Sequence, residues 1–426
     1  MSVYLNFVPI FLFVLIYVGT GVYCSIIGIE NAFYQISPTV AIIPAIILGM
    51  FLHKGSKEQK FQCFIDGVRH KDIILMCIVF ILAGAFSSVT SAIGSIDATV
   101  NFALNLVPSR FLLLGLFITA AFISTAVGTS MGTIATMAPI AAGLIDQGVF
   151  PAALAMGTVV GGAMFGDNLS MISDTTVASV MSQEADLKKK WWLNAKIASI
   201  AAIITMLFLF FAHSSEVTII AQDYSFILVL PYIFLIAIAL TGINVLIVLV
   251  SAIIFAGITG MLYQGYGFFA FCGDISRGFA SMQEIMLLSL LVGGLSGLAS
   301  SGQKYLADNL GKWISTKSNK KLAQLMIAKI VSIFDILLAN NTVAIVFSGE
   351  IARDIARTHK IPPHYSAVWL DNFSCIFQGL IPYGAQILLA STVAGISPLE
   401  ITPFVFYCFA LLLVSLCYIL FKRELK

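Results

Sequence analysis

Apolar residues occur along this chain in runs of about 20, the length that an α-helix needs to cross the hydrocarbon core of a membrane. We expect full crossings at 7–28, 37–53, 72–93, 151–182, 192–213, 228–245, 246–263, 284–300, 364–395 and 401–421. The first run follows no basic segment and precedes no small-residue cleavage site. We therefore interpret it as a retained span rather than a signal peptide.

Two further apolar segments, 111–147 and 328–358, are each interrupted by a short stretch of small or polar residues. The interruptions are Gly128–Thr133 and Asn340–Thr342. Polar backbone and side chains at membrane depth are tolerated only where they line a cavity in the protein. This favours two re-entrant hairpins, and two full crossings joined by a tight turn are the alternative.

Lysine and arginine gather in five clusters, which are expected to face the cytoplasm. The clusters lie at 54–71, 188–196, 304–329, 353–360 and 422–426. With the crossings above and both hairpins re-entrant, all five clusters and both termini are cytoplasmic. Charge alone does not prove re-entrance, because two full crossings in place of a hairpin would leave every later cluster on the same side of the membrane.

The two halves of the chain repeat one pattern in the same order. Each break begins 23 residues before a proline, Pro151 or Pro363. The first repeat, 1–213, is expected to hold three scaffold spans, a hairpin, a broken span at 151–182 and a final span. The second repeat, 214–426, holds spans within 228–263 and 284–300, a hairpin, a broken span at 364–395 and a final span. Because five crossings is an odd number, the second half must be inverted relative to the first. Inverted repeats are typical of secondary transporters, whose binding site lies near the midplane.

Composition excludes several classes of protein. Apolar residues make up 59% of the chain and charged residues 10%, against about a quarter charged in soluble domains, so membrane lipid is the expected surrounding. No basic cluster carries interleaved aromatics, which argues against nucleic acid as a partner. The scattered cysteines and histidines indicate neither a disulfide framework nor a metal centre. Without a phosphate-binding loop, neither an enzyme nor an ATP-driven pump is expected, and no cofactor beyond transported sodium and protons.

Four carboxylates fall away from span ends and loops, inside predicted spans or a hairpin arm, where a charge is costly and therefore informative. They are Asp167, Asp174, Asp335 and Asp371. The first two belong to the densest polar stretch, 166–176, which we interpret as an unwound centre between two half-helices. Its oxygens suit a hard cation, so we predict sodium binding by Asp167 and Asp174. A carboxylate at such a site can also take up a proton, and one site for either ion gives antiport. A purely structural polar network is the alternative.

The matching stretch of the second half, 371–386, also has an acid, glycine and proline breakers, and amides. Its candidate ligands are Asp371, Asn372, Gln378 and Gln386. The lower charge suggests that this half closes the site or contacts an organic solute, although a structural role is also open. Asp335 either shares the site, with a proton or ion-pair role, or pairs with Lys329.

The hairpin tips carry hydroxyl and amide side chains that can coordinate a cation or an anionic oxygen. These residues are Thr129, Ser130, Thr133, Asn340, Asn341 and Thr342. Half-helices that begin at the tips would also favour a carboxylate through their N-termini.

The segments 128–141 and 166–176 resemble the NhaC-type sodium/proton antiporter family of the ion transporter superfamily. Its G-T-S-x-G-T tip and its G-D-x-x-S-x-x-S-D-T-T stretch are both complete here. The resemblance implies an elevator-type fold with a scaffold and a transport domain, a homodimer, and a bacterial-type inner (plasma) membrane. It implies ion or substrate ligands at Thr129, Ser130, Asp167, Asn168, Ser170, Ser173, Asp174, Thr175 and Thr176, and it matches the second tip at Asn340, Asn341 and Thr342.

A second resemblance bears on the cargo. The Gly166-Asp-Asn sequence, the Asn-Asn-Thr tip and the segment 378–386 are similar to a branch that looks more like amino-acid transporters. Two hypotheses follow: sodium/proton antiport at Asp167 and Asp174, or ion-coupled carriage of an amino acid or small carboxylate. In the second, the tips bind the carboxylate, and Asp371 or Gln386 binds the amine. A passive channel is a third class, against which the paired hairpins argue.

Overall fold

The computed structural model describes residues 8–27, 29, 35–106, 108–171, 173–212, 223–239, 241, 243–300 and 319–421. This part of the chain is all-helical, as predicted. The helices of the first half are α1 (Val8–Ile26), α2 (Pro38–Leu52), α3 (Lys57–Val68), α4 (Lys71–Ala92), α5 (Ser95–Leu106), α6 (Ser109–Val127), α7 (Ser130–Asp146), α8 (Ala152–Leu169), α9 (Asp174–Gln183) and α10 (Leu187–Ala212). Those of the second half are α11 (Phe226–Ala239), α12 (Val245–Tyr263), α13 (Phe268–Ser281), α14 (Gln283–Ser300), α16 (Lys320–Leu338), α17 (Asn341–Thr358), α18 (Pro363–Gln378), α19 (Ala385–Ala394), α20 (Pro398–Ile401), the 3-10 helix η3 (Thr402–Phe404) and α21 (Phe406–Phe421).

Three described helices are long and apolar enough to cross a membrane, namely α4 (over Ile73–Ala92), α10 and α12. The number rises to five if two bent pairs each form one span: α13 with α14, bent by 41°, and α19 with Pro398–Phe404, bent by 104°. Several other predicted spans are apolar but shorter, because loops and bends divide the apolar runs. The predicted number of ten crossings is therefore not confirmed. The basic residues at 304–318 and 422–426 lie outside the described part of the chain.

Three helices occupy segments that the apolar pattern left between spans, namely α3, α5 and α13. Helix α3 begins with a reciprocal cap, in which the Ser56 hydroxyl accepts from the Gln59 amide at 3.2 Å and the Gln59 side chain accepts from the Ser56 amide at 2.9 Å. None of the α3 residues is buried. A search for long apolar runs misses such helices, since their polar residues interrupt each run.

The predicted breaks of both hairpins are present, and the two have the same local geometry. Helix α6 ends at Gly128, which has a left-handed backbone (φ 75°), and α7 follows an extended Thr129. Helix α16 ends at Ala339, which is also left-handed (φ 49°), and α17 follows an extended Asn340. The two arms of each segment contact each other. We name the turns tip 1 (residues 128–130) and tip 2 (residues 339–342).

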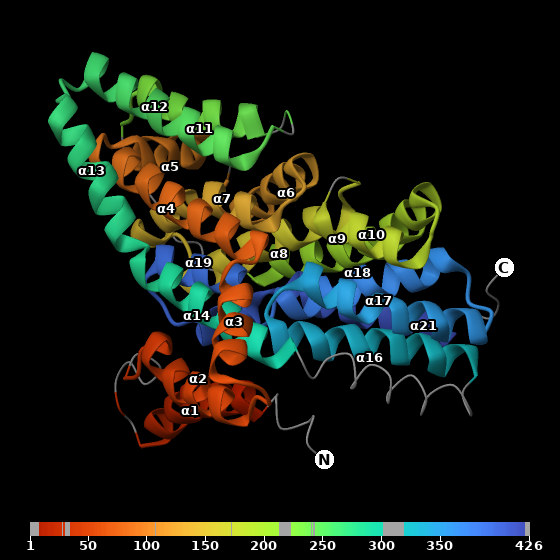
Figure 1. Cartoon of the computed structure of the whole chain (residues 1–426). Coiled ribbons are helices and arrows are strands. Elements are labelled where there is room, and N and C mark those ends of the chain that lie inside the picture. The colour runs from red at the N-terminus through yellow and green to blue at the C-terminus, as the bar shows by residue number, and fades with distance from the viewer. Residues whose placement is uncertain are drawn as a thin grey trace.

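Helices α1 and α2 lie at one end of the molecule and α11 and α12 at the opposite end, with α3, α4, α13 and α14 between them (Figure 1). Helices α8–α10, α16–α18 and α21 fill the other side (Figure 1). Each segment predicted to be a broken span contains two helices, with α8 and α9 separated at 170–173 and α18 and α19 at 379–384. Helix α9 packs on α17 and α18, whereas α19 packs on α7 and α8. Each short half-helix therefore contacts the opposite half of the chain.

Glycine allows two close helix crossings between the halves. Helix α13 crosses α4, where a Cβ on Gly84 would lie 2.2 Å from the Gly278 carbonyl oxygen. Helix α3 crosses α14, where a Cβ on Gly67 would lie 2.2 Å from the Gly293 carbonyl oxygen. Small residues let backbones approach in this way inside membranes, where burial of apolar surface does not drive association.

Replacing Gly278 by alanine should therefore lower the free energy of unfolding by about 1–3 kcal/mol, because the new methyl group would overlap the α4 backbone. Gly273→Ala on the same helix is the matched control, since no atom lies within 4 Å of its added Cβ. Thermal unfolding of both variants in detergent measures the difference. Equal stability of the two would show that the crossing tolerates a side chain.

Candidate functional site

A cavity of about 200 Å³ lies where tip 1, tip 2, α4 and the broken spans meet. Its polar lining comes from both halves of the chain. The polar residues are Thr129, Ser130, Asp167, Asp174, Thr175, Asn244, Asn340, Asn341, Thr342 and Gln386. We call it the tip cavity. It brings together eight of the residues that the sequence singled out, and a further one, Gln386, reaches it from the second broken span.

Asp167 is the most deeply placed acid of the tip cavity. It lies in the last turn of α8 and is 6% exposed. The Ser130 hydroxyl at the start of α7 donates to its Oδ2 at 2.8 Å. One residue earlier, a Cβ on Gly166 would lie 2.5 Å from the Ala121 carbonyl oxygen, so close packing of α8 on α6 fixes this carboxylate. Tip 1 and the first broken span thus meet at one hydrogen bond.

The contact continues into the second half through two buried glutamines. Gln386 Nε2 donates to Ser130 Oγ at 3.2 Å, and Gln378 Nε2 donates to Gln386 Oε1 at 2.7 Å. Gln378 Nε2 also lies 3.3 Å from the Ala339 carbonyl oxygen at tip 2. A chain of hydrogen bonds therefore runs from tip 2 to Asp167. Gln378 does not line the tip cavity and instead supports Gln386.

Asp174 occupies a different position from Asp167. It is exposed, stands in the first turn of α9 and contributes to the rim of the tip cavity. The Ser173 hydroxyl caps this helix by accepting from the Thr176 amide at 3.4 Å, and it lies 2.7 Å from Thr175 Oγ1. The two acids predicted to share one ion are thus a buried and a surface carboxylate of the same cavity.

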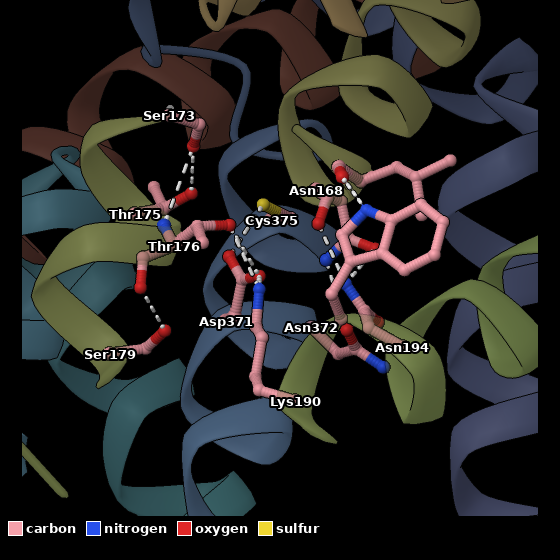
Figure 2. Close-up of polar contacts among 12 residues, drawn as sticks. Asn168, Ser173, Thr175, Thr176, Ser179, Lys190, Asn194, Asp371, Asn372 and Cys375 are labelled. Atoms are coloured by element: carbon pink, nitrogen blue, oxygen red, sulfur yellow. Dashed lines mark hydrogen bonds and ion pairs between the residues drawn. The ribbon is translucent and has the colours of Figure 1, made fainter. Parts of the chain in front are cut away.

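Asp371 is in an ion pair that the sequence analysis did not foresee. Its carboxylate and the Lys190 ammonium are both buried and in direct contact, as Figure 2 shows. Lys190 Nζ also donates to Thr176 Oγ1 at 2.8 Å. The pair neutralises Asp371 inside the protein, and this acid does not line the tip cavity.

Lys190 belongs to the basic cluster at 188–196, which is expected to face the cytoplasm. Lys188 and Lys189 are exposed, but Lys190 is 1% exposed. The buried residues Leu193, Asn194 and Ile197 follow it at helical spacing on α10. That periodicity was the signal in the sequence that could have placed Lys190 on the inner face.

Asn168 and Asn372 form a second buried contact between the halves, beside the ion pair (Figure 2). Asn168 Nδ2 donates to Asn372 Oδ1 at 2.9 Å, and Asn194 Nδ2 donates to the Asn168 carbonyl oxygen at 2.6 Å. Neither Asn168 nor Asn372 lines the tip cavity, and the same holds for Ser170, Ser173, Thr176 and Thr133. Thr133 Oγ1 donates to the Thr129 carbonyl oxygen at 3.0 Å.

Asp335 lies on α16, one turn before tip 2, and is completely buried. Neither carboxylate oxygen has a hydrogen-bond partner among the described residues. Lys329 is exposed and forms no ion pair with it within that part of the chain. Of the two alternatives for Asp335, the pair with Lys329 is not formed in the structure, because Lys329 lies at the surface while Asp335 is buried.

Comparisons with known proteins indicate a transporter family. Residues 2–213 match the model of the Na+/H+ antiporter family. The Na(+)/H(+) antiporter NhaC of Bacillus subtilis (strain 168) is 23% identical over 388 residues, which are 83% of this chain and 84% of that protein. The malate-2H(+)/Na(+)-lactate antiporter of the same organism is 21% identical over 421 residues, 90% of this chain and 88% of that protein. Among solved structures, the Alcanivorax borkumensis YdaH transporter has a TM-score of 0.44 and 12% identity, and the match covers 84% of this chain and 87% of that one.

The buried ion pair makes a prediction about stability. Lys190→Met leaves the Asp371 charge buried and unpaired, which should cost about 3–5 kcal/mol of the free energy of unfolding. The double variant Lys190→Met/Asp371→Leu should recover most of that loss, and Lys189→Met on the exposed side is the control. Thermal unfolding in detergent would contradict this prediction if Lys190→Met were as stable as Lys189→Met.

Proposed function

The chain belongs to the Na+/H+ antiporter family, and we propose that it exchanges sodium for protons with Asp167 as the carboxylate that takes either ion. It is an integral protein of the plasma membrane and a transporter rather than an enzyme, with ions as its transported substrates. The observation that carries the proposal is the position of Asp167, a buried acid in a cavity lined by hydroxyl, amide and carboxylate oxygens.

The exchange follows from the charge of the site. An isolated carboxylate in low dielectric is costly, so either a proton or a cation must neutralise Asp167 when the cavity is closed. Hydroxyl oxygens of Ser130, Thr129 and Thr175 are hard ligands that suit sodium beside this carboxylate. Binding of one ion removes the charge that attracts the other. Competition for Asp167 then couples sodium movement in one direction to proton movement in the other.

Asp174 has a supporting role in this proposal. As an exposed carboxylate at the rim, it raises the local concentration of cations at the mouth of the cavity. Sodium binding by Asp174 itself, as predicted from the sequence, would follow if the rim closes over the ion.

The two inverted repeats are also part of the proposal. Support comes from reciprocal contacts, in which α3 crosses α14 while α13 crosses α4, and α9 packs on the second half while α19 packs on the first. In this arrangement 1–213 and 214–426 are equivalent units of opposite orientation. The proposal also includes four features that the family resemblance implies: re-entrant hairpins, cytoplasmic termini, an elevator-type movement and a homodimer.

An amino acid or small carboxylate is the alternative cargo, and the comparisons do not favour it. The relative named as a malate and lactate antiporter shows only what that protein carries. The structural feature that would serve an anion is the start of α7 and α17 at the tip cavity, because helix N-termini attract carboxylates.

Proteoliposomes test the exchange directly. A sodium pulse should dissipate an imposed pH gradient without any added solute, and Asp167→Asn should reduce this flux to that of empty liposomes because it cannot exchange a proton. Asp186→Asn is the control, since Asp186 is exposed and its cap on the Lys189 amide (3.1 Å) survives as an amide oxygen. Strict dependence of the flux on an amino acid or carboxylate would select the alternative cargo, and conductance without coupling would select a channel.

Asp174→Asn should have a graded effect. Loss of one surface charge near the cation path is worth about 1 kcal/mol, so the sodium concentration for half-maximal exchange should rise about fivefold while the maximal rate is retained. Initial rates over a range of sodium concentrations measure this. Complete loss of exchange would instead make Asp174 a ligand of equal weight to Asp167.

A further inference from the structure

Asp335 is a buried acid that the exchange at Asp167 does not use. Its side chain is 0% exposed, and both of its oxygens lack a hydrogen-bond partner among the described residues. Gln378 Oε1, the free acceptor of the glutamine that contacts Ala339, also lacks a partner there. Apart from the backbone amide of Gln378, which interacts with the carboxyl, the neighbourhood of Asp335 therefore supplies acceptors and no cationic partner among the described residues.

The titratable and charged groups around Asp335 do not neutralise it. Tyr383 interacts with it electrostatically, but the Tyr383 hydroxyl donates to the Ile336 carbonyl oxygen at 2.6 Å. On α18, Asp371 is paired with Lys190, and on α14, the Glu284 carboxylate accepts from Ser37 at 2.5 Å. The remaining ones on the helices packed against α16, and on α16 itself, are Lys320, Lys321, Lys329, Glu350, Arg353, Asp354, Arg357, His364, Tyr365, Cys375, Tyr407, Cys408, Cys417 and Tyr418. None of these forms an ion pair with Asp335 within the described residues.

The space around Asp335 distinguishes a proton from a metal ion. Neither the tip cavity nor the second cavity at tip 2 includes Asp335 in its lining. A sodium ion needs several oxygen ligands around it, whereas a proton needs no additional volume. A protonated carboxyl also provides the one donor that this group of acceptors lacks.

The second cavity gives a route to Asp335. It measures about 410 Å³ and lies between α3, α14 and tip 2, and we call it the α3 cavity. Asn340 and Thr342 line both this cavity and the tip cavity, so tip 2 is the partition between them. Leu338 lines the α3 cavity and follows Asp335 by three residues on the same face of α16. The exposed residues Asp66 and His70 stand at its α3 side.

We propose that Asp335 carries a proton, and that it exchanges this proton through the α3 cavity as a second site, separate from Asp167. The proton leaves the carboxyl oxygen for water in the α3 cavity when tip 2 moves, and the carboxylate takes up a new proton from the tip cavity, on the other side of tip 2, when the tip returns. The hydrogen bonds from Ala339 through Gln378, Gln386 and Ser130 connect such a movement of tip 2 to Asp167. A role of Asp335 in transport rests on the proposed sodium/proton exchange, whereas the presence of a proton on Asp335 does not.

Infrared difference spectroscopy of the purified full-length protein tests the proton without transport. At neutral pH the wild type should show a protonated-carboxyl band that Asp335→Asn lacks and that Asp167→Asn keeps. Asp354→Asn, at an exposed position on α17, should match the wild type. The amide is isosteric with a protonated acid, so Asp335→Asn should fold with unchanged thermal stability. A spectrum of Asp335→Asn identical to the wild type at every pH would overturn the proposal.

A second acid variant keeps the test decisive if the amide variant does not fold. Asp335→Glu should retain the band at a shifted frequency, since the carboxyl group remains but its surroundings change. A band that is unchanged in Asp335→Glu would come from another residue and would overturn the assignment.

The route is tested at Cys63, which lines the α3 cavity. In a background with the exposed Cys272 and Cys417 replaced by serine, a bulky maleimide on Cys63 should slow deuterium exchange of the Asp335 band several-fold. Unchanged exchange would exclude this route. In proteoliposomes, Asp335→Asn should move fewer protons per sodium ion while sodium still binds. An unchanged coupling ratio would remove Asp335 from turnover, whereas absence of any sodium/proton exchange in the wild type would instead contradict the proposed function.

Discussion

The structure depends on one constraint: polar groups at membrane depth must find their partners inside the protein, because lipid offers none. The four helix interruptions and the buried charged side chains of the described chain are subject to the same requirement for internal partners. The hairpin tips meet it through left-handed and extended residues whose neighbours are capped, as with the Asn340 side chain and the Val343 amide at 3.0 Å. The broken spans meet it by lying against each other, so that each supplies side chains to the other.

The buried polar contacts between the halves differ in charge balance. This difference distinguishes the residues that hold the halves together from the residue that can bind an ion. Asn168 with Asn372, and Lys190 with Asp371, are internally balanced contacts that hold the two broken spans together. Asp167 accepts from the Ser130 hydroxyl but has no cationic side chain within ion-pair distance among the described residues, and it faces a cavity. Balanced buried pairs give a site its shape, whereas an acid without a counter-charge is available to an ion.

The sequence predicted much of this arrangement because glycine, proline and amide residues are rare inside apolar runs unless a helix is interrupted there. Helices are interrupted at Gly128, at Asn340 and at 170–173, and the last interruption is shorter than the predicted unwound stretch 166–176 because Asp167 and Asn168 remain in α8. The partners of the acids could not be predicted in the same way, since an ion pair such as Lys190–Asp371 joins residues 181 positions apart. Short helices such as α3 and α13 were also missed, because their stability comes from capping and from glycine contacts with distant helices rather than from an apolar run.

The glycine crossings have a consequence for the order in which the protein is made. Helix α4 packs against α13, and α3 packs against α14, with backbone contacts at Gly278 and Gly293. Synthesis proceeds from the N-terminus, so α3 and α4 emerge from the ribosome long before their partners exist. Until about residue 300 has been inserted, their small-residue faces stay against lipid or a chaperoning surface. Assembly is therefore post-insertional for this part of the fold, and a ribosome that stalls within the second half leaves a first half that cannot complete its own packing.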